Sequence, residues 1–218
     1  QYLLRAMFYN TCYRTESGLV GSVFRKEPMA ELPSDVEYLI DNADGSGLTL
    51  EQQAQYAVSE VLKKGRVGLL ADMPVTGGNV SRAQVQAGIS PNIIAYDAKS
   101  VVDWNECATP TGCKLNYVKI EEFYQELDID SGDRTDVKRW RVLRLRDGVY
   151  TSQITYEGGA GMADEEEVTP TQADKTPFDF IPFVFCGSRN NSPAIDPAPL
   201  YDLAEVNIGH YRNSADTE

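Results

Sequence analysis

The sequence is poor in the side chains and motifs that enzymes use for catalysis. Its 218 residues include a single histidine, His210, so a catalytic triad or a general base would depend on that residue alone. It contains no CxxC pair and no GxSxG, Walker or GxGxxG motif, and its glycine-rich stretch 158–161 lies in an acidic segment. We therefore expect no enzyme activity, no catalytic residues, no cofactor and no metal ion.

Long apolar runs and positive charge are also scarce. No stretch approaches the roughly 18 apolar residues of a membrane-spanning helix, and no secretory signal pattern is visible, so we expect no membrane partner. The 20 Lys and Arg residues face 33 Asp and Glu, for a net charge of -13. This charge argues against general nucleic-acid binding, because phosphates are neutralised by basic surfaces. It fits an acidic wall past which DNA slides, and equally any soluble acidic protein.

The four cysteines are too few and too scattered for the disulfide framework of a small secreted protein. Cys107 and Cys113 flank residues 108–112, a turn-rich insert that would bring them together in a hairpin. A disulfide bridge, thiolate ligands of a metal ion and two reduced thiols are all open for this pair. The single histidine in the chain argues against a zinc site.

Hydrophobic periodicity predicts two helices in the first third of the chain. Residues 1–26 carry apolar side chains at three- and four-residue steps, and Pro28 ends this helix. The second helix begins after Thr49, which forms a capping box with Gln52. Gly65 is its C-terminal stop.

Short apolar runs of strand length follow, at residues 67–71, 92–96, 115–123, 137–145, 149–156 and 181–185. Asp147-Gly148 is a strong signal for a two-residue hairpin. Residues 157–179, rich in Gly, Pro, Thr and acids, are expected to form a long loop or a partly disordered protrusion. Residues 196–199 start a final helix. The predicted fold class is α+β: a mixed, mostly antiparallel sheet bracketed by an N-terminal and a C-terminal helix.

Two acidic loops partly match cation-binding patterns. Residues 42–53 mimic an EF-hand loop, with oxygen-bearing side chains at the first, third and fifth positions and glycine at the sixth. The twelfth position is Gln53, which cannot supply the usual bidentate carboxylate. We interpret this loop as a turn leading into a capped helix, with calcium binding as the alternative. Residues 128–133 are a second candidate turn or metal loop, and the acidic run 164–167 is either solvated or docks a partner.

Basic residues gather near the fourth predicted strand: Arg134, Lys138, Arg139, Arg141, Arg144 and Arg146. Alternate residues of a strand face opposite sides, so Arg139 and Arg141 face away from the strand's other basic residues. The cluster is therefore not one basic stripe. Pairing with the acidic excess, on the surface or between subunits, is favoured over contact with DNA.

Short motifs spread over nearly the whole chain form an ordered set. They are Phe8-Tyr9-Asn10, Arg14, Gly18-Leu19-Val20-Gly21, Val23-Phe24-Arg25-Lys26, Pro28, residues 67–74, Ile94-Ala95-Tyr96, Val101-Val102-Asp103-Trp104, Asp147-Gly148-Val149-Tyr150, Ile181-Pro182-Phe183-Val184-Phe185, residues 200–207 and His210-Tyr211-Arg212. In their order and spacing they resemble a family of bacteriophage portal-like structural proteins. None of them is a chemical motif.

The resemblance implies a subunit of the portal ring, the channel at a capsid vertex through which DNA is packaged and ejected. Such a ring has about twelve subunits. Residues 1–198 would be a wing-like α+β domain, and 199–218 would start a connector helix towards a stem region absent from this chain. The implied partners are further copies of the chain, the capsid, the packaging motor, head–tail adaptor proteins and double-stranded DNA passing through without sequence-specific binding. The implied location is the virion's capsid vertex, with the host cytoplasm during assembly.

Six residues are the expected contacts with a neighbouring subunit or with the stem. Gly18 and Gly21 would let another backbone approach the first helix closely. The last helix carries a broad apolar stripe, which we expect to be covered by a neighbouring subunit or by the stem. The stripe consists of Leu200, Ala204, Ile208 and Tyr211, broadened by Leu203, Val206 and His210. Of these, the expected contacts are Leu203, Val206, His210 and Tyr211.

Two other functions stay open. Another phage head–tail connector or structural protein fits the same features. A metal-dependent hydrolase that uses the acidic loops is the alternative from a different class. Because the chain begins at Gln1 and ends at Glu218 inside a predicted helix, we also expect it to be a piece of a longer polypeptide.

Overall fold

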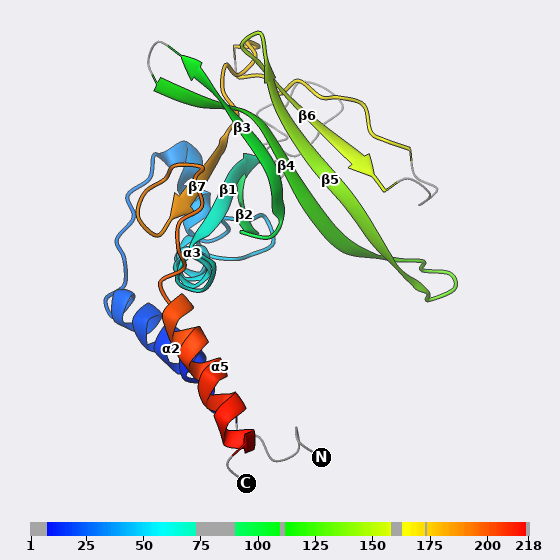
Figure 1. Ribbon diagram of the computed structural model, residues 1–218. Coiled ribbons are helices and arrows are strands. Elements are labelled where there is room, and N and C mark those ends of the chain that lie inside the picture. The colour runs from blue at the N-terminus through cyan, green and yellow to red at the C-terminus, as the bar shows by residue number, and fades with distance from the viewer. Residues whose placement is uncertain (1–7, 73–89, 110–111, 158–162, 173, 217–218) are drawn as a thin grey trace. The chain divides into compact units, whose positions relative to one another are not determined.

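The computed structural model describes residues 8–72, 90–109, 112–157, 163–172 and 174–216 (Figure 1). Within them the fold is α+β with mostly antiparallel sheets, which confirms the predicted class, although the strands divide between two sheets. The chain forms two compact units: unit 1 is Gln1–Ala98 with Val184–Glu218, and unit 2 is Lys99–Phe183. The predicted boundary at residue 198 stays a prediction.

Unit 1 contains four helices within the described residues and a three-stranded sheet of order β2-β1-β7. Its elements are α2 (Thr11–Val23), the 3₁₀ helix η1 (Ser34–Ile40), α3 (Leu50–Lys64), β1 (Arg66–Asp72), β2 (Asn92–Asp97), β7 (Phe183–Gly187) and α5 (Tyr201–Asp216). Unit 2 is a four-stranded sheet of order β3-β4-β5-β6. Its strands are β3 (Val101–Thr109), β4 (Gly112–Leu127), β5 (Arg134–Arg146) and β6 (Val149–Tyr156).

The first helix is shorter than the sequence pattern predicts. Residues 1–7 lie outside the described residues, residues 8–10 are not helical, and α2 begins where the Asn10 side chain accepts a hydrogen bond from the Tyr13 N–H at 3.0 Å. The helix ends at Val23, before Pro28. Asn10 is an effective N-cap, and such a cap sets the start of a helix independently of the apolar pattern on either side of it.

Helix α3 follows its predicted end signals. Thr49 accepts a hydrogen bond from the Gln52 N–H at 3.2 Å, and the Gln52 side chain accepts one from the Thr49 N–H at 3.1 Å. This capping box satisfies two backbone donors at the start of the helix. At the other end Gly65 adopts a left-handed conformation, and its N–H donates to the Val61 carbonyl.

A partly buried charge network joins α3 to β2. Lys64 Nζ lies 2.6 Å from a carboxylate oxygen of Glu60 and 2.7 Å from one of Asp97. Burial lowers the pKa of the Lys64 ammonium, but its hydrogen bonds to Asp97 and Glu60 outweigh burial, and the net shift is upward. Glu60 is itself buried and also pairs with Lys63 at 2.8 Å. A buried carboxylate needs such partners.

Strand β1 is the centre of its sheet, which explains its uninterrupted apolar run. Val67, Leu70 and Phe185 are fully buried. Arg66 is buried with them: its guanidinium lies 4.8 Å from the centroid of the Phe185 ring and donates a hydrogen bond to the Pro193 carbonyl at 3.1 Å. Burial lowers the pKa of this guanidinium.

The turn between α3 and β1 fixes the path of the C-terminal residues. The Ser188 N–H donates to the Gly65 carbonyl at 2.9 Å, and the Leu200 N–H donates to the Leu62 carbonyl at 3.2 Å. A Cβ atom on Gly65 would lie 2.3 Å from the Asp196 carbonyl oxygen. Helix α5 therefore starts beside the end of α3 and then runs alongside α2 (Figure 1).

The sheet of unit 2 pairs strands that are neighbours in the sequence, all antiparallel. Asp147 and Gly148 both have positive φ, 51° and 76°, as a type I′ turn requires, so the predicted hairpin is confirmed. Strand β3 and the helix η1 are additional elements. The apolar pattern does not predict β3, because its sequence is interrupted by the exposed polar residues Asp103, Asn105 and Glu106.

Residues 163–168 run beside β6, which differs from the free loop or disordered protrusion expected over 157–179. Ser152 and Val168 exchange two backbone hydrogen bonds, of 2.9 and 2.8 Å, and the Glu165 N–H donates to the Ile154 carbonyl at 3.0 Å. Residues 158–162 and 173 lie outside the described residues. The composition of this segment does not predict the pairing, because the pairing is made by backbone hydrogen bonds and not by side chains.

We predict that Gly65→Ala destabilises the protein by about 2–4 kcal/mol, since alanine would be strained at φ 83° and would clash with the Asp196 carbonyl. Gly47→Ala is the matched control, because Gly47 also has positive φ but a Cβ there meets nothing within 4 Å. It should lose only about 1–2 kcal/mol. Chemical denaturation measures both, and equal losses would contradict the close contact at Gly65.

Candidate subunit-contact surfaces

Helix α2 lies on the outside of unit 1 and has no buried residue. It is held on one side by Glu16, whose carboxylate accepts a hydrogen bond from the Ser59 hydroxyl on α3. Tyr13 and Leu19 are exposed, and Val23 is 62% exposed. Apolar side chains on a helix without a buried residue leave hydrophobic surface open in the single chain.

Helix α5 buries a narrower stripe than predicted. Asn207 is buried, and Tyr211 is half-buried, with its ring edge-on to Phe8 at a centroid distance of 5.7 Å. Ile208, expected on the stripe, is exposed, because the helix turns the side that carries Asn207 inward. Val206 is 70% exposed. The hydrophobic pattern could not predict the burial of Asn207, because that pattern considers only apolar residues.

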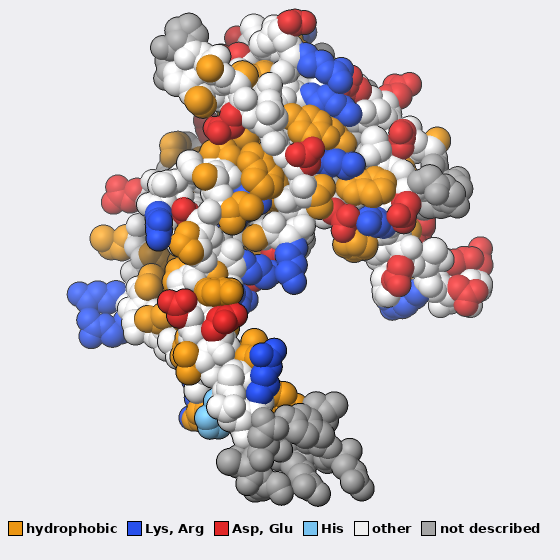
Figure 2. Space-filling model, viewed as in Figure 1, with side chains coloured by type: hydrophobic (Ala, Val, Ile, Leu, Met, Phe, Trp, Pro, Cys, Tyr) orange, Lys and Arg blue, Asp and Glu red, His pale blue; other side chains and the backbone are white. Residues whose placement is uncertain are grey.

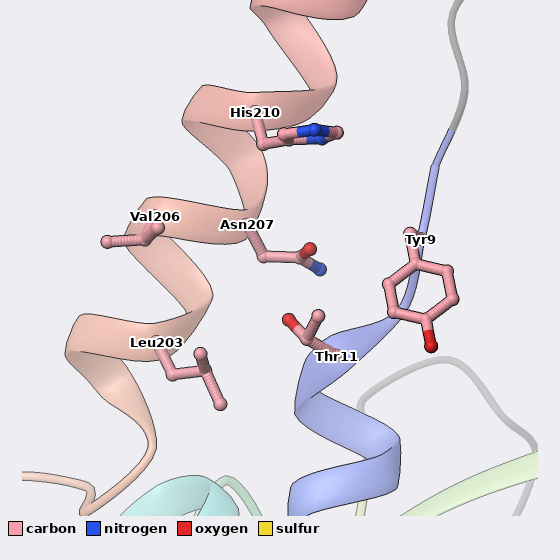
Figure 3. Close-up of a pocket in the computed structure, with 6 residues that line it drawn as sticks. All are labelled: Tyr9, Thr11, Leu203, Val206, Asn207 and His210. Carbon is pink, nitrogen blue, oxygen red and sulfur yellow. The ribbon is translucent and has the colours of Figure 1, made fainter.

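A small pocket of about 210 Å³ separates α5 from the start of α2 (Figure 3). Figure 3 shows Asn207 and His210 projecting from α5 towards α2, with the Asn207 amide pointing at Thr11. Its six lining residues are Tyr9, Thr11, Leu203, Val206, Asn207 and His210. No carboxylate is among these six, so the pocket lacks the Asp or Glu that orients the histidine of a Ser-His-Asp triad.

The predicted contact residues fall into two groups. Leu203, Val206 and His210 meet in the pocket, and Tyr211 packs on Phe8 just beyond it. Gly18 and Gly21 are apart from these: a Cβ atom at either glycine would meet nothing within 4 Å. Among the described residues, therefore, no other backbone packs on the small-residue face of α2.

The acidic loop before α3 uses its side chains to hold its own backbone. Asp44 Oδ1 accepts hydrogen bonds from the N–H groups of Ser46 at 2.8 Å and Leu48 at 3.1 Å, and Asn42 Oδ1 accepts one from Gly47 at 2.8 Å. The buried Gln53 side chain donates to the Ile93 carbonyl. These contacts support the turn interpretation, because Gln53 stands at the position of the bidentate glutamate, carries no carboxylate and is held by the Ile93 carbonyl.

The loop between β4 and β5 is built in the same way. Asp128 Oδ1 accepts hydrogen bonds from the backbone of Asp130 at 2.9 Å and of Ser131 at 3.3 Å, and these bonds lower the pKa of the Asp128 carboxyl. Within the described residues, no group of three or more His, Cys, Asp or Glu side chains is placed to hold a metal ion.

Charges alternate with aromatic rings over β4 and β5, as Figure 2 shows in orange, blue and red. On one face Arg139 and Arg141 both donate to Glu122, at 2.7 and 2.8 Å, which confirms that these two arginines share a side. On the other face Lys138 pairs with Glu121 at 3.0 Å and lies over the Trp140 ring. This pairing with the acidic excess is the arrangement favoured over contact with DNA.

The acidic run 164–167 forms hydrogen bonds and ion pairs with β5 and β6, so it is not the fully solvated stretch of one of the two expectations. Glu167 accepts a hydrogen bond from the Thr151 hydroxyl at 2.8 Å and lies 3.3 Å from Arg144 and 3.7 Å from Arg146. The Thr151 bond and the two arginines lower the pKa of the Glu167 carboxyl. Asp164 Oδ1 accepts the Tyr156 N–H at 2.9 Å.

The cysteines flanking the β3–β4 hairpin are free thiols. Cys107 is paired with Lys114, and Cys113 with Ala108, so the two side chains lie at successive rungs on opposite faces of the sheet. In this register a bridge between them is geometrically excluded. Separately, no helix among the described residues is both long and apolar enough to cross a lipid bilayer.

We predict that calcium leaves the melting temperature unchanged, because Gln53 cannot supply the bidentate carboxylate of a calcium loop and is buried against the Ile93 carbonyl. Thermal melts in calcium and in EDTA test this. Asp44→Ala is the control variant: it should melt lower, through loss of the turn, and remain equally indifferent to calcium. A melting temperature that rises and saturates with calcium would overturn the turn interpretation.

We predict that Glu167→Gln lowers stability at neutral pH by at most about 1 kcal/mol, since Glu167 is partly exposed. Its native pKa is lowered, so its contribution is present above the ordinary carboxyl pKa and is lost as the pH falls through the native value. The gap between variant and native protein should close as the pH falls from about 5 towards 2. Denaturation at several pH values measures this, with the exposed neighbour Glu166→Gln as control; a gap that persists in acid would contradict it.

The chain matches no model of a known protein family and no curated protein sequence. The resemblance to phage portal-like proteins stays a prediction, carried by the order and spacing of the short motifs along the chain.

Proposed function

We propose that the protein is a structural subunit of the phage portal ring, contributing its wing region at the capsid vertex through which DNA is packaged and ejected. The observation that supports this most is the open apolar surface of α2, a helix with no buried residue. The exposed Val206 and Ile208 of α5 add to it. Surfaces of this kind are covered in assemblies.

The disposition of charge is compatible with the same role. Several clustered basic side chains of β5 bind carboxylates within the chain, which leaves the acidic excess to dominate the surface. A channel component that DNA must slide past benefits from weak phosphate binding. The proposed partners are further copies of the chain in a ring of about twelve, the capsid, the packaging motor and the head–tail adaptor. The proposed location is the virion, with the host cytoplasm during assembly.

A different head–tail connector or structural protein would share the open helices. The hydrolase alternative has less support. In the acidic loops, Asp44 and Asp128 accept hydrogen bonds from the backbone of their own turns. His210 has no carboxylate among the residues that line its pocket. We therefore propose no enzyme activity.

Particle mass tests the proposal directly. We predict that the protein self-associates into a closed ring, visible by mass photometry and negative-stain imaging. A protein that stays monomeric at micromolar concentration would contradict the proposed portal ring. A closed ring with a very different subunit number would instead favour another connector.

We predict a split outcome for Gly18→Leu and Gly21→Leu. In the separate subunit each change should leave stability unchanged or raise it by up to about 1 kcal/mol, because glycine is a poor helix former and a Cβ at each position has open space. If this face of α2 contacts a neighbour, assembly should be lost. Melting curves and particle mass separate the two effects, and rings that form normally in both variants would exclude the face from the interface.

A further inference from the structure

The strands β4 and β5 project from their sheet as a two-stranded arm. Their pairing continues from Tyr124↔Val137 to Leu127↔Arg134, past the last pair with β3 (Val101↔Ile120) and the last with β6 (Arg139↔Tyr156). Figure 1 shows this ribbon running on alone to the turn between the two strands. We use "the arm" for residues 123–137. A lone two-stranded ribbon is marginally stable in water, so an arm of this kind gains from a partner.

The arm carries apolar side chains at positions that are exposed to solvent, where polar residues are usual. Phe123 is 68% exposed, and Leu127, four residues on and therefore on the same face, is also exposed. Ile129 is 89% exposed in the terminal loop. The loop is closed by a 2.9 Å hydrogen bond from the Asp128 N–H to the Asp133 carbonyl, so it is a defined structure.

The arm is acidic. It holds five carboxylates, Glu126, Asp128, Asp130, Asp133 and Asp136, against one basic residue, Arg134. Any partner must therefore offer both an apolar surface and positive charge.

Helix α2 and the three residues after it have that combination. Its exposed apolar side chains include Leu19 and Val23, one turn apart on the same face. The exposed Arg25 and Lys26 follow directly. The only acid of α2, Glu16, is occupied by Ser59.

We propose that the arm of one copy of this protein docks on α2 of the next copy, with its apolar side chains against Leu19 and Val23 and its carboxylates beside Arg25 and Lys26. The inference rests on the proposed ring. A contact between two different surfaces is head-to-tail, and head-to-tail contacts generate rings when the rotation closes. It also covers the apolar side chains of α2 that the described part of one chain leaves exposed.

The experiment is a charge exchange read out by mass photometry of the full chain. Asp130→Lys with Asp133→Lys reverses charge on the arm, and Arg25→Glu with Lys26→Glu reverses it on α2. Each pair alone should weaken self-association about tenfold or more, and the quadruple variant should regain most of it. Raised salt should weaken the native contact and the exchanged one alike.

The apolar part is tested by Ile129→Ser and Phe123→Ser, which should also weaken assembly about tenfold. Ile195→Ser is the control, because Ile195 is 69% exposed in unit 1 but belongs to neither surface. Unchanged circular dichroism of all variants shows that the fold persists, as expected for exposed positions.

The outcomes separate the two proposals. Closed rings that ignore every arm and α2 variant would overturn the docking of the arm and leave the ring proposal standing. Open chains or dimers that respond to the charge exchange would support the arm and overturn the portal ring. A native protein that never associates would overturn both.

Discussion

The close passage of residues 62–66 beneath residues 185–200 is the constraint on which unit 1 depends. At this crossing Gly65 has no side chain to keep the chains apart, and backbone hydrogen bonds are accepted by the carbonyls of Gly65 and Leu62. The buried Arg66, stacked on Phe185, follows directly. The partners are more than a hundred positions apart in the chain. Once they are joined, α5 must start at the end of α3, and its line along α2 follows.

That placement decides which surfaces remain open. α5 turns its Asn207 side inward and covers only part of α2, so Val206 and most of the apolar residues of α2 stay uncovered. In unit 2 the most exposed apolar side chains, Phe123 and Ile129, stand on the arm, while several of the strand charges are paired within the sheet. Apolar side chains are therefore exposed on α2, α5 and the arm in addition to those buried in the core. Exposed apolar groups of this kind are typical of surfaces that contact a partner.

Local signals were readable from the sequence, and long-range ones were not. The capping box at Thr49, the stop at Gly65, the Asp147-Gly148 turn and the opposite facing of neighbouring basic residues on β5 all depend on a few adjacent positions. Two features required distant partners: the pairing of residues 163–168 with β6, and the burial of Asn207. The arm was missed for a related reason. The predicted strands stop at residue 123 and start again at 137, whereas β4 runs to Leu127 and β5 starts at Arg134, and the ends of β3 and β6 define the extra length as a projection.

The division of unit 1 into two stretches of sequence has a consequence for the order in which the protein forms on the ribosome. Unit 2 is continuous, and each of its strands pairs with the one made just before it, so it can fold as soon as Phe183 has left the exit tunnel. Unit 1 must wait, with Arg66 and the end of α3 lacking their covering residues, until the final stretch from Val184 emerges. A protease-resistant fragment spanning unit 2 on stalled nascent chains is what this order implies. The residues from Val184 to Leu200 therefore complete unit 1 by covering the α3–β1 turn, long after that turn has been made.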